Sequence, residues 1–164
     1  MTVLLVTVAV FLLYVFVLRR WYNGWGATAE EIALSMPEDR MVPNPLIEMT
    51  HAITIQASYD HVFSYLKQIG QGRGGYYSYD WLERLFGFGI HNVYHLEAEL
   101  LHLKVGDHVR LHQNGMGATV LVLEENHKLV IGMDSRKLVP GRRYFVPVPK
   151  SMFIVGFWSF TVQP

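Results

Sequence analysis

The apolar residues at the amino end of the chain form one unbroken run. Positions 2–18 read TVLLVTVAVFLLYVFVL and contain no charged side chain. A helix rises about 1.5 Å per residue, so this run gives roughly 25 Å, just short of the ~30 Å hydrocarbon core of a bilayer. Trp21 and Tyr22 come next, and such aromatic residues favour the headgroup level. The pattern predicts a single transmembrane helix over residues 1–20.

A cleaved signal peptide and a buried core helix are the other interpretations of this run. A signal peptide has its positive charge before the apolar stretch, whereas Arg19 and Arg20 follow it, and no small-residue cleavage site precedes Trp21. A core helix would carry a polar stripe, which this run lacks. Because positive residues stay on the cytoplasmic side, the arginine pair predicts that everything after residue 20 is cytoplasmic.

Residues 21–50 predict a connector with little regular structure. Thr28 and Glu31 have the spacing of a capping box, so a short helix is expected from there to about Ser35. Three prolines between positions 37 and 45 then break regular structure.

In residues 51–164 the hydrophobic pattern changes between helix and strand periods. Alternation over Ala52–Ala57 predicts a strand. An apolar face at helical spacing then predicts a helix that starts at Ser58 or Asp60 and ends near Ile69. Asp80 and Glu83 form a second capping box, which predicts another helix and explains the spacing of these two carboxylates without catalysis. The apolar face of the first helix consists of Val62, Phe63, Leu66 and Ile69.

The remainder of this region predicts a series of strands. Runs at 107–112, 118–124 and 128–133 are separated by turn signals at Gly115 and Asn126. The run from Phe153 to Val162 predicts one or two further strands rich in aromatic residues. Because strands follow one another without intervening helices, we expect an α+β domain with an antiparallel sheet.

Composition excludes several classes of function. The 14 Lys and Arg residues balance 14 Asp and Glu residues, so no basic surface for nucleic acid is expected. The chain has no Cys, which excludes disulfides, thiolate metal sites and cysteine nucleophiles. Hydrophobic residues make up 51% of the chain and charged residues 17%, which is typical of a folded chain rather than a disordered one.

The eight histidines give no strong indication of a metal site. His108 and His112 fall in a predicted strand, where four residues span about 13 Å, too far to share one ion. His91 and His95 could share a helical face, but no carboxylate completes an H-E-x-x-H pattern. We therefore expect neither a metal nor a cofactor.

A glycine-rich segment, Gly70–Gly75, matches the pattern G-x-G-x-x-G. A dinucleotide fingerprint requires a strand before it and a helix after it, whereas here a predicted helix precedes it and tyrosines follow. Two interpretations stay open. The segment is either a turn that uses glycine for positive φ, or a loop at the mouth of a cavity, with Arg73 offering a charge and the tyrosines a wall.

Aromatic residues are concentrated near the end of the chain. Phe153, Phe157, Trp158 and Phe160 fall within eight positions. Such residues suit the wall of an apolar cavity and equally suit an ordinary core.

The segment Gln68–Glu83 (QIGQGRGGYYSYDWLE) resembles the signature of one branch of the SRPBCC superfamily, which includes the START, polyketide-cyclase and birch-pollen-allergen proteins. Trp25–Thr28 after a membrane segment and Val105–Asp107 at the start of a strand are similar to the same branch. The resemblance covers Trp25 to Pro164. It implies a helix-grip fold, in which a curved antiparallel sheet and a long C-terminal helix enclose an apolar tunnel.

The strand predicted to end near Val162 is not followed by the final strands and long helix of that fold. We therefore expect an incomplete, C-terminally truncated helix-grip domain: either the chain is a truncated gene product, or another segment or a partner covers the concave face of its sheet. The resemblance implies a hydrophobic small molecule or lipid as the partner of this domain.

Together, the pattern and the resemblance predict a membrane-tethered, non-catalytic protein that binds a hydrophobic ligand. The alternatives are a polyketide cyclase-like or dehydratase-like enzyme, with Asp80, His91 and Arg73 as candidate groups, and a membrane protein whose domain only mediates contacts. The resemblance assigns no catalytic residue. The residues expected to contact a ligand are Arg73, Tyr76, Tyr77, Tyr79, Trp81 and Trp158.

Overall fold

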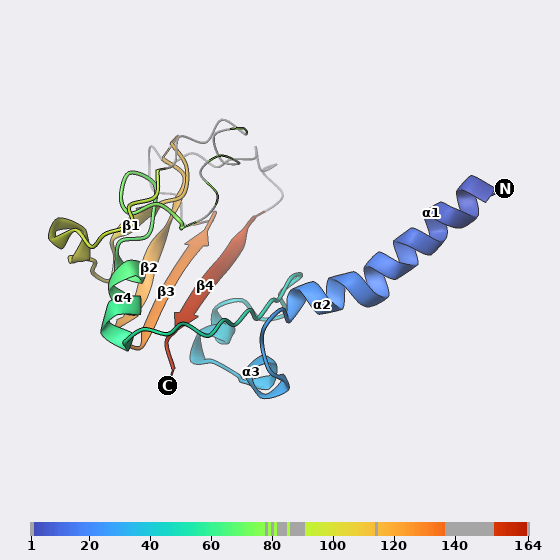
Figure 1. The fold of residues 1–164 in the computed structure, drawn as a ribbon, viewed down its shortest axis with the longest axis horizontal. Helices are drawn as coiled ribbons and strands as arrows, with labels where there is room; N and C mark the ends of the chain where they lie inside the picture. Colours follow the sequence, from blue (N-terminus) through green and yellow to red (C-terminus); the bar gives the residue numbers. More distant parts are fainter. Residues whose placement is uncertain are drawn as a thin grey trace. The chain divides into compact units, whose positions relative to one another are not determined.

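The computed structural model describes residues 2–77, 79, 81, 85, 91–113, 115–136 and 153–163. The chain divides into two units, one before and one after the bond between Gln56 and Ala57. Each unit is described by itself, and Figure 1 labels its helices and strands.

The first unit begins with a long apolar helix. Its three parts, α1 (Thr2–Leu13), the π-helical turn η1 (Tyr14–Leu18) and α2 (Arg19–Asn23), follow one another without a break (Figure 1). The 22 residues from Thr2 to Asn23 have a mean hydropathy of 2.5 over their most apolar window, and none of that window is buried. This helix is long and apolar enough to span a membrane.

The connector after this helix contains the predicted capping box. The Thr28 hydroxyl accepts a hydrogen bond from the Glu31 amide at 3.2 Å, and the Glu31 carboxylate accepts one from the Thr28 amide at 2.7 Å. These two bonds start α3 (Ala29–Ala33). The 3₁₀ turn η2 (Pro37–Met41) follows.

The strand predicted over Ala52–Ala57 is absent, so this prediction was wrong. The segment forms no ladder in the described residues, and Ile53 and Ile55 are 68% and 50% exposed. The Ala52 amide instead donates to the Trp25 carbonyl at 3.3 Å. Alternation describes the two sides of an extended chain, but a strand also requires a neighbouring strand to receive its backbone hydrogen bonds.

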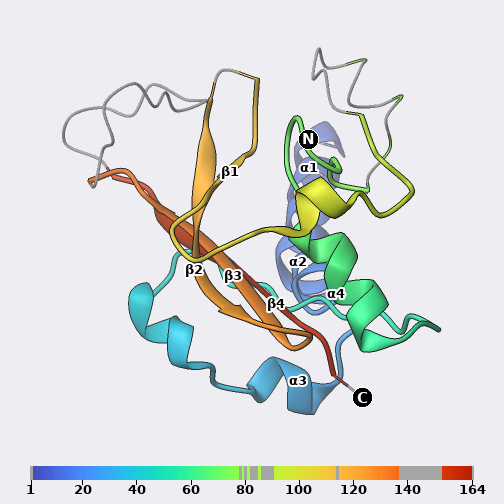
Figure 2. The same cartoon turned by 90° about the vertical axis from the view of Figure 1, so that its left-hand side faces the viewer.

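The second unit contains a four-stranded antiparallel sheet in chain order, β1 (His108–Arg110), β2 (Gly117–Glu124), β3 (Lys128–Asp134) and β4 (Val155–Thr161) (Figures 1 and 2). Gly115 and Asn126 have φ values of 87° and 59°, so both turn predictions are confirmed. The unit is α+β with an antiparallel sheet, as the sequence pattern indicates.

One helix, α4 (Tyr59–Lys67), packs on a face of this sheet (Figure 2). Ser58 is its N-cap residue, and Phe63 on its apolar face is completely buried. Leu66 and Ile69 pack against the same core. The core joins α4, the segment after the 3₁₀ turn η3 (Ala98–Leu101) and three strands through Phe63, Leu103, Val109, Ala118, Val120, Leu129 and Ile131.

Candidate functional site

An apolar pocket lies on the sheet face that also carries the core. Ile131 belongs to the core cluster and is paired directly with Trp158 across β3 and β4. Directly paired residues of antiparallel strands place their side chains on the same face. Met133 and Gly156 form the next pair on that face. The pocket is therefore a continuation of the core surface toward the Asp134 end of β3.

The pocket has a volume of about 150 Å³ and an apolar lining. Ile131 contributes its side chain to both the core and the pocket, while Trp158 is 54% exposed. The described lining residues are Ala118, Ile131, Gly132, Met133, Ile154, Gly156, Phe157 and Trp158.

Small residues create the hollow. Gly156 sits opposite Met133, and a Cβ added to it would meet no atom within 4 Å among the described residues. Ala118 on β2 also contributes only a methyl group to the lining. Glycine in a strand leaves the neighbouring surface uncovered, because there is no side chain to fill it.

Polar contacts fix the chain at one end of the pocket. The Ser135 amide donates to the Ile154 carbonyl, and the Ser135 hydroxyl accepts from the Ile154 amide, each at 2.8 Å. The Arg136 guanidinium makes two 2.9 Å hydrogen bonds to the Asp134 carboxylate and lies 4.7 Å above the ring of Phe153. The hydrogen bonds that Arg136 donates to the Asp134 carboxylate raise the pKa of Arg136.

The chemistry available in the pocket is the burial of apolar groups. Its lining in the described residues contains no ionisable side chain. The pocket is a partly open hollow rather than an enclosed cavity, and its volume of about 150 Å³ is comparable to the space that one benzene ring needs. The hollow therefore suits a ring or a short alkyl segment, which can be part of a larger hydrophobic molecule.

The aromatic residues near the end of the chain serve both purposes that the sequence left open. Phe160 packs against the core, whereas Phe157 and Trp158 line the pocket. Phe153 is 60% exposed beneath Arg136.

The glycine segment forms a closed turn. Gly70 and Gly75 exchange two backbone hydrogen bonds, of 2.8 and 3.1 Å, and the Gln71 amide donates to the Arg110 carbonyl at 2.8 Å. Both glycines have positive φ, 128° and 81°. The turn thus closes on itself and is fastened to the end of β1, which accounts for the glycines on structural grounds.

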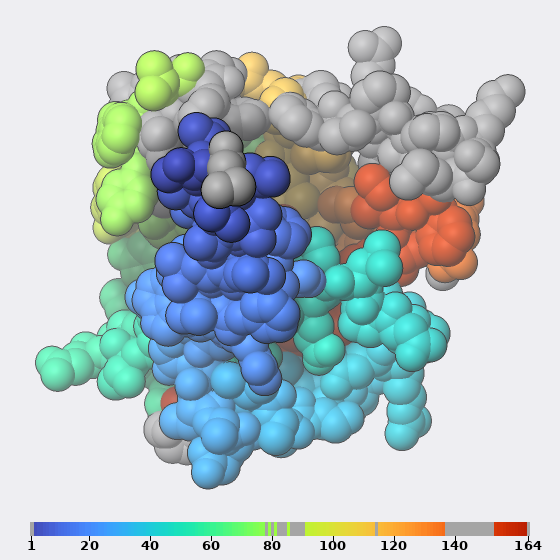
Figure 3. Space-filling view, turned by 90° about the vertical axis from the view of Figure 1, so that its right-hand side faces the viewer, coloured from blue at the N-terminus to red at the C-terminus, as the bar shows by residue number. Residues whose placement is uncertain are grey.

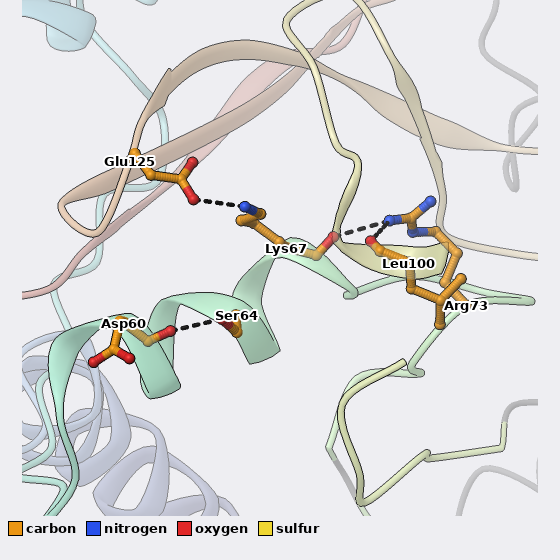
Figure 4. Close-up of polar contacts among 6 residues, drawn as sticks. All are labelled: Asp60, Ser64, Lys67, Arg73, Leu100 and Glu125. Atoms are coloured by element: carbon orange, nitrogen blue, oxygen red, sulfur yellow. Dashed lines mark hydrogen bonds and ion pairs between the residues drawn. The ribbon is translucent and has the colours of Figure 1, made fainter. Parts of the chain in front are cut away.

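Arg73 is held inside this turn rather than offered to a cavity (Figure 4). Its guanidinium donates to the carbonyls of Lys67 and Leu100, and so joins the end of α4 to η3. Partial burial lowers the pKa of Arg73, an effect that the Asp107 carboxylate opposes. Lys67 in turn makes a 2.6 Å ion pair with Glu125.

Gln68 is the centre of a polar network that the sequence did not single out. It is completely buried, and its amide nitrogen donates to the Tyr77 hydroxyl at 2.8 Å and to the His95 carbonyl at 3.1 Å. Its side-chain oxygen accepts from the Glu97 amide at 3.3 Å, and its carbonyl accepts from the Gly74 amide. The network fastens the glycine turn to residues 91–97.

Two of the predicted ligand-contacting tyrosines belong to the same network. The Tyr76 hydroxyl donates to the Arg110 carbonyl at 2.7 Å. The Tyr77 ring meets the Tyr65 ring edge-on at 5.3 Å, and partial burial raises the Tyr77 pKa, which the Gln68 bond partly offsets. The Asn92 side chain accepts from both tyrosine amides, at 2.9 and 2.7 Å.

The predicted ligand-contacting residues thus fall into separate places. Arg73 lies in the glycine turn, Tyr76 and Tyr77 follow directly after it, and Trp158 lies in the pocket. Tyr79 and Trp81 are 72% and 66% exposed. Only Trp158 among the six is part of the pocket lining that the structure describes.

The groups named for catalysis do not gather around the pocket in the part of the chain that is described. His91 is exposed, and Arg73 bonds to backbone carbonyls. Asp80 and its capping box lie outside the described residues. Within residues 2–77, 91–113, 115–136 and 153–163, no three His, Asp or Glu side chains are close enough to hold a metal ion.

Sequence reasoning missed most of the pocket lining. Gly132 and Gly156 interrupt strands that otherwise carry large side chains, and this was the available signal. Gln68 and Asn92 gave no signal, because the bonds from Gln68 to His95 and from Tyr77 to Asn92 join residues 27 and 15 positions apart. No family model, no curated protein and no solved structure matches this chain.

Proposed function

We propose that this protein is a membrane-tethered binding protein for a hydrophobic small molecule or lipid. The observation that carries the proposal is the apolar pocket between Ile131 and Trp158, on a sheet face where Trp158 and Ile154 remain exposed. Burial of apolar surface favours association by about 0.8 kcal/mol per CH₂ group. Since the described lining offers no acid or base, it favours binding over a cyclase-type reaction.

The resemblance to SRPBCC proteins supports the same function. We propose that the second unit is a helix-grip-type domain and that its pocket is one wall of the ligand site. An antiparallel meander with a helix on one face is compatible with such a domain.

We further propose that Thr2–Asn23 anchors the protein in a membrane and that the second unit is cytoplasmic. The helix supports the anchor by length and hydropathy, and the Arg19–Arg20 pair supports the orientation. Alkaline carbonate should leave the full chain in the membrane fraction, and external protease should spare the second unit in intact cells. Release by carbonate, or cleavage from outside, would contradict the respective statement.

Photo-crosslinking tests the binding site. The full chain in micelles is labelled with a diazirine-bearing fatty acid, and the crosslinked peptides are mapped. We expect crosslinks at Ile131–Met133 and Ile154–Trp158. The Gly156→Val variant should lose them, because a Cβ added at Gly156 meets no described atom within 4 Å and the larger valine side chain therefore occupies space in the hollow.

The matched control is Val105→Leu, which enlarges an exposed side chain away from the pocket lining. It should leave the crosslinks unchanged. Crosslinks that are confined to Thr2–Asn23, or that persist in Gly156→Val, would exclude this pocket as the ligand site.

A further inference from the structure

The segment Leu46–Ile55, here called the apolar segment, exposes large side chains in the first unit. Leu46 is 96% exposed, Ile47 67% and Ile53 68%. Met49 and Ile55 are about half-exposed. Five large apolar side chains exposed within ten residues are unusual on a protein surface and indicate a site of interaction.

Hydrogen bonds place the apolar segment at the end of the long helix. The Thr50 amide donates to the Asn23 carbonyl at 2.8 Å, and the Ala52 amide to the Trp25 carbonyl at 3.3 Å. The His51 ring nitrogen Nε2 bonds to the Tyr22 carbonyl at 2.8 Å. Figure 3 looks onto this unit and shows the teal segment beside the blue helix.

The side chain of His51 also contacts aromatic rings at this helix end. Its ring meets the Tyr22 ring edge-on at 5.3 Å and the Trp25 ring at 6.4 Å. Tyr22 and Trp25 are themselves 56% and 48% exposed. Aromatic residues next to an apolar helix favour the interface between hydrocarbon and water.

The sequence of the apolar segment alternates between apolar and polar residues. Positions 47, 49, 53 and 55 are Ile, Met, Ile and Ile, and the positions between them include Glu48, Thr50 and Thr54. Alternate residues of an extended chain point to the same side. His51 shares the odd-numbered positions of the apolar residues, and its ring contacts Tyr22 and Trp25 at the helix end.

The charge of this unit indicates what kind of surface it can meet. Residues 1–56 carry three arginines and five carboxylates, so electrostatic attraction to anionic lipids is weak. Its exposed apolar side chains, by contrast, gain from burial in any acyl boundary.

We propose that the apolar segment lies in the surface of the same bilayer that the helix spans, so that the protein is held by a helix and by an interfacial segment. This inference rests on the membrane-spanning role proposed for Thr2–Asn23. The exposed side chains of the segment contact the lipid interface, because the backbone hydrogen bonds to residues 23 and 25 hold the segment at the level where the helix leaves the membrane.

Site-specific fluorescence tests the inference. Because the chain contains no native Cys, a single introduced cysteine can be labelled selectively. The full chain is reconstituted in nanodiscs of zwitterionic phosphatidylcholine, with the dye NBD on a single introduced cysteine. Ile47→Cys and Ile53→Cys report on the apolar segment. Val105→Cys, an exposed apolar position of the second unit, is the matched control, and Leu12→Cys reports on the helix.

We expect blue-shifted emission at Ile47→Cys and Ile53→Cys, and severalfold stronger quenching by brominated phosphatidylcholine than at Val105→Cys. Anionic lipid should leave this quenching unchanged. Quenching at Leu12→Cys without quenching at both segment positions overturns the inference and leaves the anchor standing. Blue-shifted but unquenched emission at the segment also overturns it, because a protein surface then covers the side chains. Absence of quenching at Leu12→Cys refutes the anchor itself.

Discussion

Two neighbouring residue pairs on one face of the sheet have different surroundings. Leu129 pairs with Phe160, and both pack in the core beneath α4. Ile131 pairs with Trp158 only two positions further along each strand, and there Trp158 is 54% exposed beside an apolar pocket. The residue types are alike, so the difference is one of cover. We call these the covered end and the open end.

The covered end is buried by more segments than α4 alone. The glycine turn, fastened by Arg73 and Gln68, joins the end of α4 to η3, β1 and residues 91–97 (Figure 4). Polar contacts therefore hold together the segments that bury the covered end, while the open end keeps an apolar surface exposed.

Truncation of buried and open aromatic residues should give the largest contrast. Phe63→Ala removes a completely buried ring and should lower the free energy of unfolding by about 3–5 kcal/mol. Trp158→Ala, at the open end, should cost about 1 kcal/mol or less. Urea unfolding followed by circular dichroism measures both. Equal losses would show that the two ends are covered alike.

An alanine substitution in the glycine turn should give the next largest loss in the free energy of unfolding. Gly75 has a φ of 81°, and an added Cβ would meet the His91 carbonyl at 2.8 Å, so Gly75→Ala should cost about 2–5 kcal/mol through strain and overpacking. Gly106→Ala is the matched control: its φ is 93°, but no described atom lies within 4 Å. Gly106→Ala should lower the free energy of unfolding by about 1–2 kcal/mol, through backbone strain alone. Thermal unfolding of the two variants side by side measures the difference, and identical midpoints would contradict the close packing of the turn.

Loss of the buried side-chain amide of Gln68 should lower the free energy of unfolding by a smaller amount. Gln68→Leu leaves the Glu97 amide and the His95 carbonyl without this partner, at a cost of about 1–3 kcal/mol. Gln113→Leu replaces an exposed glutamine and should be nearly neutral. Hydrogen exchange should also speed up at residues 91–97 in Gln68→Leu alone. Unchanged hydrogen exchange at residues 91–97 would show that Gln68 does not help to stabilise the covered end.

The smallest expected effect is a pH dependence from Tyr77. Because burial raises its pKa in the folded protein, the neutral phenol is favoured by folding. Its contribution to stability is complete below the unfolded value of about 10 and declines as the pH rises above that value. Thermal unfolding across this range should therefore fall more steeply for the native protein than for Tyr77→Phe. Parallel curves would show that Tyr77 titrates as freely as in the unfolded chain.

Much of the fold could be predicted from local sequence. The turns at Gly115 and Asn126 separate β1, β2 and β3, and each strand pairs with its neighbour in the chain, so local pattern sufficed. The capping box at Thr28 involves residues three apart and was equally readable. Ala52–Ala57 failed as a strand because alternation does not specify a pairing partner.

The site was less predictable for a physical reason. Trp158 and Phe160 are equivalent as sequence signals, and only the packing of distant segments separates the open end from the covered end. Arg73 was expected at a cavity mouth, but its partner Leu100 is 27 positions away and could not be inferred from spacing.

We propose that the open end binds a hydrophobic ligand. Native mass spectrometry of the full chain, released from nanodiscs made from its host membrane, tests it most directly. We predict a bound hydrophobic species on the native protein and its loss in Gly156→Val, with both proteins equally folded. A native protein without such an adduct, or the same adduct on both proteins, would contradict the claim.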